Sequence, residues 1–198
     1  MSLCFETIKI QNQKIENIDY HNQRMNLTRK ALYGSSSDID LLDFISLPND
    51  QALYRCKVLY AQSVEDVSLY PYKPRDIERI KIICSDIEYR YKFADRSEID
   101  NLFAKREDCD EVLIVDSNGL LRDTTIANIA LKLDGRWHTP KNPLLAGTLR
   151  QKLLDSGDLI ESILGIDDLK RAEGFALMNA MIGFYEMDKA IGKIFPKL

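Results

Sequence analysis

Short strand-like segments separated by tight turns dominate the second half of the chain and restrict its fold most strongly. The segment DEVLIVDSNGLLRDTT contains the turn Ser117-Asn118-Gly119, and the following segment IANIALKLDGRWHTP contains Asp134-Gly135. Asn-Gly and Asp-Gly pairs between apolar segments are strong signals of β-hairpins. Residues 110–140 are therefore predicted to form two consecutive hairpins.

The remaining elements are expected to be a few helices and further strands. Residues 3–10 alternate between apolar and polar positions as a strand does, and residues 20–34 have helical spacing that Gly34 would end. A second helix is expected over residues 35–45, and later helices over residues 97–108 and 146–157. Further strands are expected at 53–61, 66–73 and 80–89, all in the first half, where they would form an antiparallel sheet.

This mixture of short strands and helices predicts an α+β fold with two small lobes and a cofactor cleft between them. The first domain is placed at residues 1–90. The second, larger domain, with the hairpins, is placed at residues 91–198.

Composition excludes several classes of protein. The net charge of the 198 residues is −4 and basic residues form no block, so nucleic acid is not an expected partner. No apolar run approaches the roughly 20 residues of a membrane span, and no secretory signal precedes the first strand, so a cytoplasmic protein without a membrane partner is expected. The four cysteines form no C-x-x-C pair, so no metal site is predicted.

Lys92 is the first candidate for chemistry. Its neighbours Tyr89, Tyr91 and Phe93 would remove water from its amine, which favours the neutral form that can react with an aldehyde. A solvated surface lysine is the alternative interpretation.

Asp123 is the second candidate, and Thr124 and Thr125 follow it directly. A carboxylate at a strand end can pair with the nitrogen of a heterocycle and keep that nitrogen protonated. The two threonines offer hydroxyl and amide donors to a phosphate. The alternative is an aspartate that only stabilises a turn or caps a helix.

Two further features suit an anion. Gly147, Thr148 and Leu149 open a predicted helix, and the start of a helix attracts phosphate through its amide groups and dipole. A helix merely capped by Thr148 is the alternative. Arg24 can bind two phosphate oxygens at once, or can form a surface ion pair. An amine, a carboxylate and a phosphate site together fit pyridoxal phosphate.

The order of these segments resembles the fold-type IV pyridoxal-phosphate enzymes, which include branched-chain and D-amino-acid aminotransferases and aminodeoxychorismate lyase. LCFETIKI is similar to the family's opening FET-I-R strand, and YHNQRM to its H-x-x-R-L helix. YKFADR looks like the lysine segment, and DEVLIVDSNGLLRDTTIANIAL resembles the segment with the acid and N-I-F. TPKNPLLAGTLRQKLL is similar to the phosphate-binding segment, and ALMNAMIGFYEM to the lyase substrate segment.

The resemblance implies roles for particular residues. Lys92 would be the catalytic lysine that bonds to pyridoxal phosphate, and Asp123 would meet the pyridine nitrogen where the family usually has glutamate. Residues on the phosphate side would be Arg24, Thr124, Thr125, Gly147, Thr148 and Leu149. The amino substrate, a small molecule, would meet Asn179, Ala180 and Arg96, and Lys57 could meet a substrate carboxylate.

The activity implied is that of an aminodeoxychorismate lyase of folate biosynthesis, which converts 4-amino-4-deoxychorismate to 4-aminobenzoate and pyruvate. LMNAM and Arg96 favour the lyase. A class IV aminotransferase acting on a small or branched-chain amino acid is the alternative, and a non-catalytic homologue is a third possibility. The resemblance also implies a homodimer.

Overall fold

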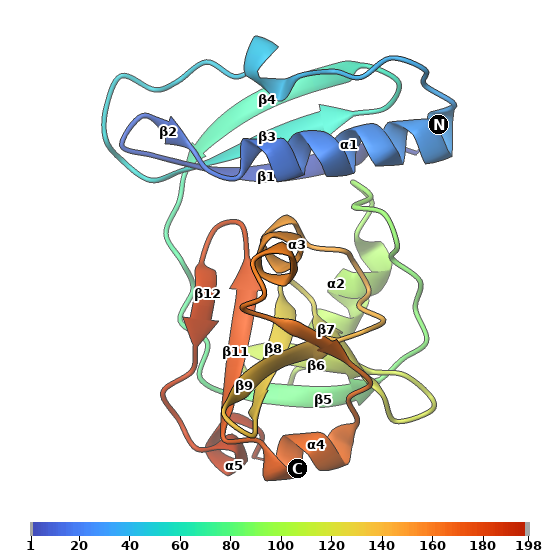
Figure 1. Ribbon diagram of the computed structural model, residues 1–198, viewed down its shortest axis with the longest axis vertical. Helices are drawn as coiled ribbons and strands as arrows, with labels where there is room; N and C mark the ends of the chain where they lie inside the picture. The colour runs from blue at the N-terminus through green and yellow to red at the C-terminus, as the bar shows by residue number, and fades with distance from the viewer. Residues whose placement is uncertain (1, 197–198) are drawn as a thin grey trace. The chain divides into compact units, whose positions relative to one another are not determined.

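The computed structural model describes residues 2–196 and contains two compact units (Figure 1). The first unit comprises the chain up to Pro74 together with Tyr91–Asp95, and the second comprises Arg75–Arg90 and the chain from Arg96 onward. The chain thus passes between the units more than once, whereas a single boundary at residue 90 was predicted. The α+β class is confirmed.

The first unit is a four-stranded antiparallel sheet with one long helix on it. The strand order is β2 (Lys14–Ile15), β1 (Cys4–Gln11), β3 (Tyr54–Tyr60) and β4 (Val64–Pro71). Helix α1 (Ile18–Tyr33) lies along one face of this sheet (Figure 1). Alternate residues of β1, including Ile8 and Ile10, pack with Met25 of α1 in a fully buried core.

In this unit the strands predicted at 3–10, 53–61 and 66–73 and the helix predicted at 20–34 are confirmed, and one predicted helix is wrong. The first strand and the long helix form, and Gly34 ends the helix with a φ of 67°, which glycine adopts easily. The helix expected at 35–45 is reduced to the short 3-10 helix η1 (Leu41–Asp43). Two asparagines of α1 bind backbone amides of this segment that a longer helix would use. Asn26 Oδ1 accepts from Ile39 N at 3.0 Å, and Asn22 Oδ1 accepts from Leu41 N at 2.9 Å.

As far as residue 196, the second unit contains two sheets and four helices. One sheet has the order β5 (Ile80–Cys84), β6 (Glu111–Val115) and β7 (Leu121–Thr124). The other has the order β10 (Ile160–Ser162), β9 (Arg136–Pro140), β8 (Asn128–Leu133), β11 (Gly174–Asn179) and β12 (Gly183–Glu186). The helices are α2 (Ser97–Ala104), α3 (Thr148–Asp155), α4 (Ile166–Arg171) and α5 (Ile191–Ile194).

Both predicted hairpins form. Strand β6 pairs antiparallel with β7, and β8 with β9, whose turn residues Asp134 and Gly135 have φ of 50° and 74°. Positive φ at both central positions is the geometry that matches the twist of the flanking strands. Buried residues of β6, β8 and β11, such as Leu113, Ile129 and Phe175, form the core of this unit.

The strand predicted at 80–89 was assigned to the wrong sheet. Strand β5 ends at Cys84 and pairs in parallel with β6 in the second unit. The residues between β5 and β6 contain α2. A connection of this length allows two strands to pair in parallel, which a short turn would not allow. Over residues 2–196 the structure has no helix long and apolar enough to cross a membrane.

Candidate functional site

Asp123 is the most constrained of the predicted site residues. It lies in β7 and is 4% exposed. Its Oδ1 accepts a hydrogen bond from Asn128 Nδ2 at 2.9 Å, and its Oδ2 accepts one from Leu145 N at 3.0 Å. Burial raises the pKa of Asp123 to about 6, although these donors and nearby Arg150 act in the opposite direction. The carboxyl group therefore has a fixed orientation and can change charge near neutral pH.

Thr124 and Thr125 begin a turn that closes on itself. Thr124 Oγ1 donates to Ala127 O at 3.0 Å, and Thr125 Oγ1 donates to Glu111 Oε1 at 2.5 Å. Glu111 is completely buried and also pairs with Arg75 at 2.9 Å. Both threonine hydroxyls thus hold the turn, and they would have to give up these acceptors in order to donate to a phosphate.

The predicted substrate residues Arg96 and Asn179 contact the same turn. Arg96 Nη2 donates to Thr125 O at 2.9 Å, and Asn179 Nδ2 donates to Ile126 O at 3.1 Å. Asn179 Oδ1 also accepts from the backbone at Met181 and Ile182, so Ala180 lies in an ordered turn between β11 and β12. Residues far apart in the sequence are therefore brought together around residues 124–127.

The start of α3 completes this group of residues. Gly147 is the N-cap, Thr148 is the first helical residue, and no side chain caps the helix. Thr148 is therefore not the cap that the alternative interpretation required. A β-carbon on Gly147 would lie 1.9 Å from Asn128 Oδ1, so only glycine fits there without displacing Asn128. The amides of a helical first turn have no acceptor within the helix, which suits an anion.

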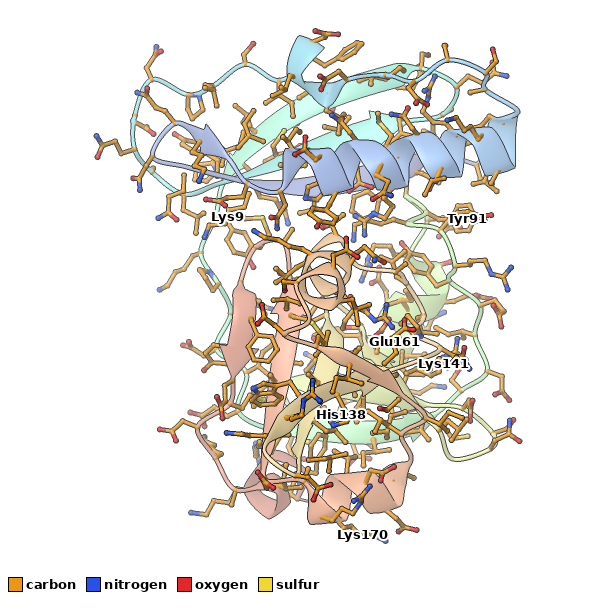
Figure 2. All side chains as sticks on the ribbon, in the orientation of Figure 1. Lys9, Tyr91, His138, Lys141, Glu161 and Lys170 are labelled. Carbon is orange, nitrogen blue, oxygen red and sulfur yellow. The ribbon has the colours of Figure 1, made fainter. Side chains whose placement is uncertain are left out.

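Arg150 of α3 is a buried positive charge close enough to Asp123 to lower its pKa. It is 4% exposed, and its Nη2 donates to Pro140 O at 2.9 Å and to Glu161 Oε1 at 2.7 Å. Figure 2 shows Glu161 and His138 on the neighbouring strands β10 and β9. His138 lies in β9, and its Nδ1 lies 2.8 Å from Ser162 Oγ.

Lys92 belongs to the first unit, where residues 91–95 extend along the start of β1. Phe5 N donates to Lys92 O at 2.9 Å, and Phe93 forms a bridge with Cys4. The Lys92 amine lies 4.7 Å from the centre of the Phe5 ring, and the Lys57 amine lies 5.5 Å from the same ring. Phe5, distant in sequence, is thus an aromatic neighbour of two of the predicted site residues, Lys92 and Lys57.

Arg24 also lies in the first unit, in an ion cluster with Glu6 and His21. Its Nε donates to Glu6 Oε1 at 2.9 Å and its Nη2 donates to Oε2, while His21 Nδ1 lies 2.6 Å from Oε2. Burial alone would raise the pKa of Glu6, but Arg24 and His21 outweigh burial and lower it to about 2. Burial lowers the pKa of His21, and the charge of Lys92 acts in the same direction. Arg24 and Lys92 are therefore neighbours within this unit.

Three functional candidates were missed by sequence reasoning: Glu6, Glu111 and Asn128. Each is a buried polar side chain in a strand, and their exposed fractions are 0%, 0% and 6%. A polar residue at an inward-facing strand position was the available signal for Glu6 and Asn128. Their partners lie elsewhere in the sequence, so that signal could not reveal what they bind.

The arrangement matches proteins of known fold. Residues 96–189 match the model of the family described as Amino-transferase class IV. An uncharacterized protein from Haemophilus influenzae is 36% identical over 184 residues, covering 90% of this chain and 97% of the relative.

Two solved structures extend the comparison. One, from Haemophilus somnus, is of a protein provisionally named a 4-amino-4-deoxychorismate lyase; it is 32% identical with a TM-score of 0.84, covering 92% of this chain and 98% of that chain. The other is a hypothetical aminotransferase from Mycobacterium tuberculosis in its pyridoxal-phosphate-bound form. It is 16% identical with a TM-score of 0.78, covers all of this chain and 84% of its own, and so supports the fold alone.

Fold and sequence together define a fold-type IV enzyme. The chain belongs to the class IV aminotransferase family, the fold-type IV pyridoxal-phosphate enzymes, and is a lyase or aminotransferase of that family.

Proposed function

We propose that this protein is a pyridoxal-phosphate-dependent lyase that converts 4-amino-4-deoxychorismate to 4-aminobenzoate and pyruvate. The observation that carries the proposal is the group formed by Asp123, the turn at 124–127 with its anchors Arg96 and Asn179, and the uncapped start of α3. The 32% identity to the Haemophilus somnus protein supports the lyase in particular.

The side chains present suit the cofactor chemically. Lys92 supplies the amine for its aldehyde, Asp123 the carboxylate for its ring nitrogen, and the amides of Thr148 and Leu149 the donors for its phosphate. Gly147, Thr124 and Thr125 are proposed to lie on the phosphate side, where the threonine hydroxyls would exchange their present acceptors for phosphate oxygens, and Arg24 is proposed to add a positive charge. When bound, pyridoxal phosphate accepts the electrons released as a bond at the substrate carbon breaks.

Lys92 is proposed to act as the acid and base of the reaction. Its amine lies 4.7 Å from the centre of the Phe5 ring, and an amine released at this place could take a proton from a substrate carbon and return one. Asp123 in its ionised form would keep a ring nitrogen charged, and the hydrogen bonds from Asn128 and Leu145 favour that form.

The remaining predicted residues are proposed to bind the substrate. Lys57, partly buried beside Phe5, suits a carboxylate, and the reaction's substrate carries two carboxylates. Arg96 would interact with a second acidic group, and the ordered turn containing Asn179 and Ala180 would line the substrate side.

An aminotransferase is the second candidate, because the family model that matches residues 96–189 is that of class IV aminotransferases. The two activities share the cofactor and Lys92 but differ in co-substrate. We also propose that the protein is a cytoplasmic homodimer, which sedimentation of the purified protein and fractionation of cells would test.

The decisive experiment begins with cofactor binding. Protein reconstituted with pyridoxal phosphate is expected to gain absorbance in the near-ultraviolet and visible range, and borohydride followed by peptide mass spectrometry is expected to place the adduct on Lys92. The variant Lys92→Ala should carry no adduct. Lys132→Arg is a matched control, because this lysine lies beside a different ring, Trp137, and its loss should change nothing.

Substrate assays then separate the activities. The lyase should release pyruvate and 4-aminobenzoate from 4-amino-4-deoxychorismate without a keto acid. Product from alanine and 2-oxoglutarate alone would support the aminotransferase instead. Protein that stays colourless, with no adduct on Lys92, would support a non-catalytic homologue.

A further inference from the structure

Asn128 lies at the centre of a closed set of hydrogen bonds in the second unit. Its Nδ2 donates to Asp123 Oδ1 at 2.9 Å and to Leu145 O at 2.8 Å, so both amide protons are used. Leu145 N in turn donates to Asp123 Oδ2 at 3.0 Å. The three residues therefore form a ring in which each oxygen of the carboxylate receives a donor, and the backbone N–H of Leu144 also donates to this carboxylate.

This ring fixes the direction of the carboxylate. Two donors on opposite oxygens leave one plane in which the carboxylate can lie. Asp123 and Asn128 are only 4% and 6% exposed, so water does not readily replace these hydrogen bonds. Hydrogen bonds donated to a carboxylate favour its charged form. The nearby charged group that acts on Asp123 from α3 is Arg150, which favours the same form.

The same side chain also holds the segment before α3. Asn128 Nδ2 binds Leu145 O, and Asn128 Oδ1 occupies the space that a β-carbon on Gly147 would need. Asn128 thus joins the acid on β7 to the backbone that leads into Thr148. The groups proposed to bind the ring nitrogen and the phosphate of pyridoxal phosphate would therefore both be positioned by Asn128.

We propose that Asn128 is the positioning residue of this site: its side-chain amide orients the Asp123 carboxylate, keeps it ionised, and fixes its place relative to the start of α3. The functional consequence rests on the proposed function, in which Asp123 meets the ring nitrogen. Aspartate is one methylene shorter than the glutamate usual in the family, so its orientation is less adjustable and needs an external donor.

The first test uses the cofactor-free protein. Carboxyl carbons of aspartate are labelled with ¹³C, the Asp123 signal is identified by its loss in Asp123→Asn, and its pKa is read from a pH titration. In Asn128→Leu, which keeps the size but removes the donor, the pKa of Asp123 is expected to rise by roughly one unit, the effect of losing one hydrogen bond to a charged group.

The matched control is Thr139→Val. Thr139 is fully buried in the same unit and donates to Ile129 O at 2.8 Å, so this variant also loses one buried hydrogen bond but leaves Asp123 untouched. A purely structural role for Asn128 would destabilise both variants and leave the Asp123 titration unchanged in both, and that result would overturn the proposal.

A second measurement needs no substitution at Asn128. In wild-type protein the side-chain amide signals of Asn128 are expected to shift with the same midpoint as Asp123, and to stop doing so in Asp123→Asn. Independent titrations would contradict the contact.

The third test concerns the cofactor. The Kd of pyridoxal phosphate is expected to rise at least tenfold in Asn128→Leu and to stay unchanged in Thr139→Val. If wild-type protein binds no pyridoxal phosphate, the proposed function fails, whereas the titrations of the cofactor-free protein still decide whether Asn128 controls Asp123. If binding is normal in Asn128→Leu, the positioning role is refuted while the proposed function stands.

Discussion

Substituting Gly147 by alanine should destabilise the second unit through Asn128. The added β-carbon would lie 1.9 Å from Asn128 Oδ1 and 3.1 Å from its Cγ. Carbon and oxygen atoms that are not bonded approach to roughly 3–3.5 Å, so the amide must move by about 1 Å or more. Its hydrogen bonds to Asp123 and Leu145, at 2.9 and 2.8 Å, cannot survive such a shift.

The size of the loss follows from those two bonds. A hydrogen bond to a charged group contributes roughly 1.5–3 kcal/mol and a neutral one roughly 0.5–1.5 kcal/mol, so Gly147→Ala should cost about 2–4 kcal/mol. Backbone effects are small, because φ at Gly147 is −71°, which alanine accepts. Alanine is a poorer N-cap than glycine but lowers the entropy of the unfolded chain, and these two effects largely cancel.

The assay is urea unfolding of the cofactor-free protein, followed by tryptophan fluorescence. Trp137 is the only tryptophan and lies in β9, so its signal reports on the second unit. Gly192→Ala is the control, since a β-carbon on Gly192 would have no neighbour within 4 Å. This control should leave the free energy of unfolding within about 0.5–1 kcal/mol of wild type.

A double-mutant cycle isolates the cause. In Asn128→Ala the obstructing amide is absent, so adding Gly147→Ala should cost close to nothing, which gives a coupling of about 2–4 kcal/mol between the two positions. An equal cost of Gly147→Ala in both backgrounds would refute the argument, because the strain would then come from some other contact.

Three further predictions concern charge. Because burial raises the pKa of Asp123 to about 6, this group binds more protons in the folded than in the unfolded protein. As pH rises from about 3 to about 7, the free energy of unfolding of wild type should therefore fall by roughly 3 kcal/mol relative to that of Asp123→Asn. A constant difference between the two proteins in parallel urea titrations would contradict this. The lowered pKa of Glu6, about 2, has the opposite effect on stability. Ionised Glu6 should contribute roughly 3 kcal/mol to the free energy of unfolding above pH 4.5, and this contribution should be lost as pH falls to 2. Thermal unfolding of Glu6→Gln should not show that loss. Lys57→Met should raise the KM for 4-amino-4-deoxychorismate roughly tenfold, as expected for losing a charged contact of about 1.4 kcal/mol, and an unchanged KM would remove Lys57 from the substrate site.

Much of the local structure could be predicted because its signals are local. The turn at Asp134-Gly135 and the end of α1 at Gly34 depend on backbone conformations that few residue types adopt, so both were correct. The segment at 35–45 has cap residues and apolar spacing as well, yet it does not form the expected helix. Its amides bind Asn22 and Asn26, which lie in another element, and no local pattern contains that information.

The residues of the candidate site were recognisable by their chemical type and order, but not by their partners. Lys92 was predicted from its aromatic sequence neighbours, but the sequence did not show that its amine also lies over Phe5, which it does because residues 91–95 extend along β1. Thr125 was expected to offer its hydroxyl to a phosphate, but that hydroxyl binds Glu111. Hydrogen-bonding capacity is set by residue type, while its use depends on what the fold brings within about 3 Å.

The sequence by itself therefore determined the hairpins, the long helix and the α+β class, and it supplied Asp123 and Lys92 as the candidate acid and amine. Tertiary structure alone decided that β5 joins β6 and that Asp123 is held by Asn128 and Leu145. The physical reason is range: turn and helix signals act over a few residues, whereas strand pairing and burial join segments far apart in the chain. The charge state of a buried carboxyl group depends on those distant contacts, so the sequence supplies the group and the fold sets its pKa.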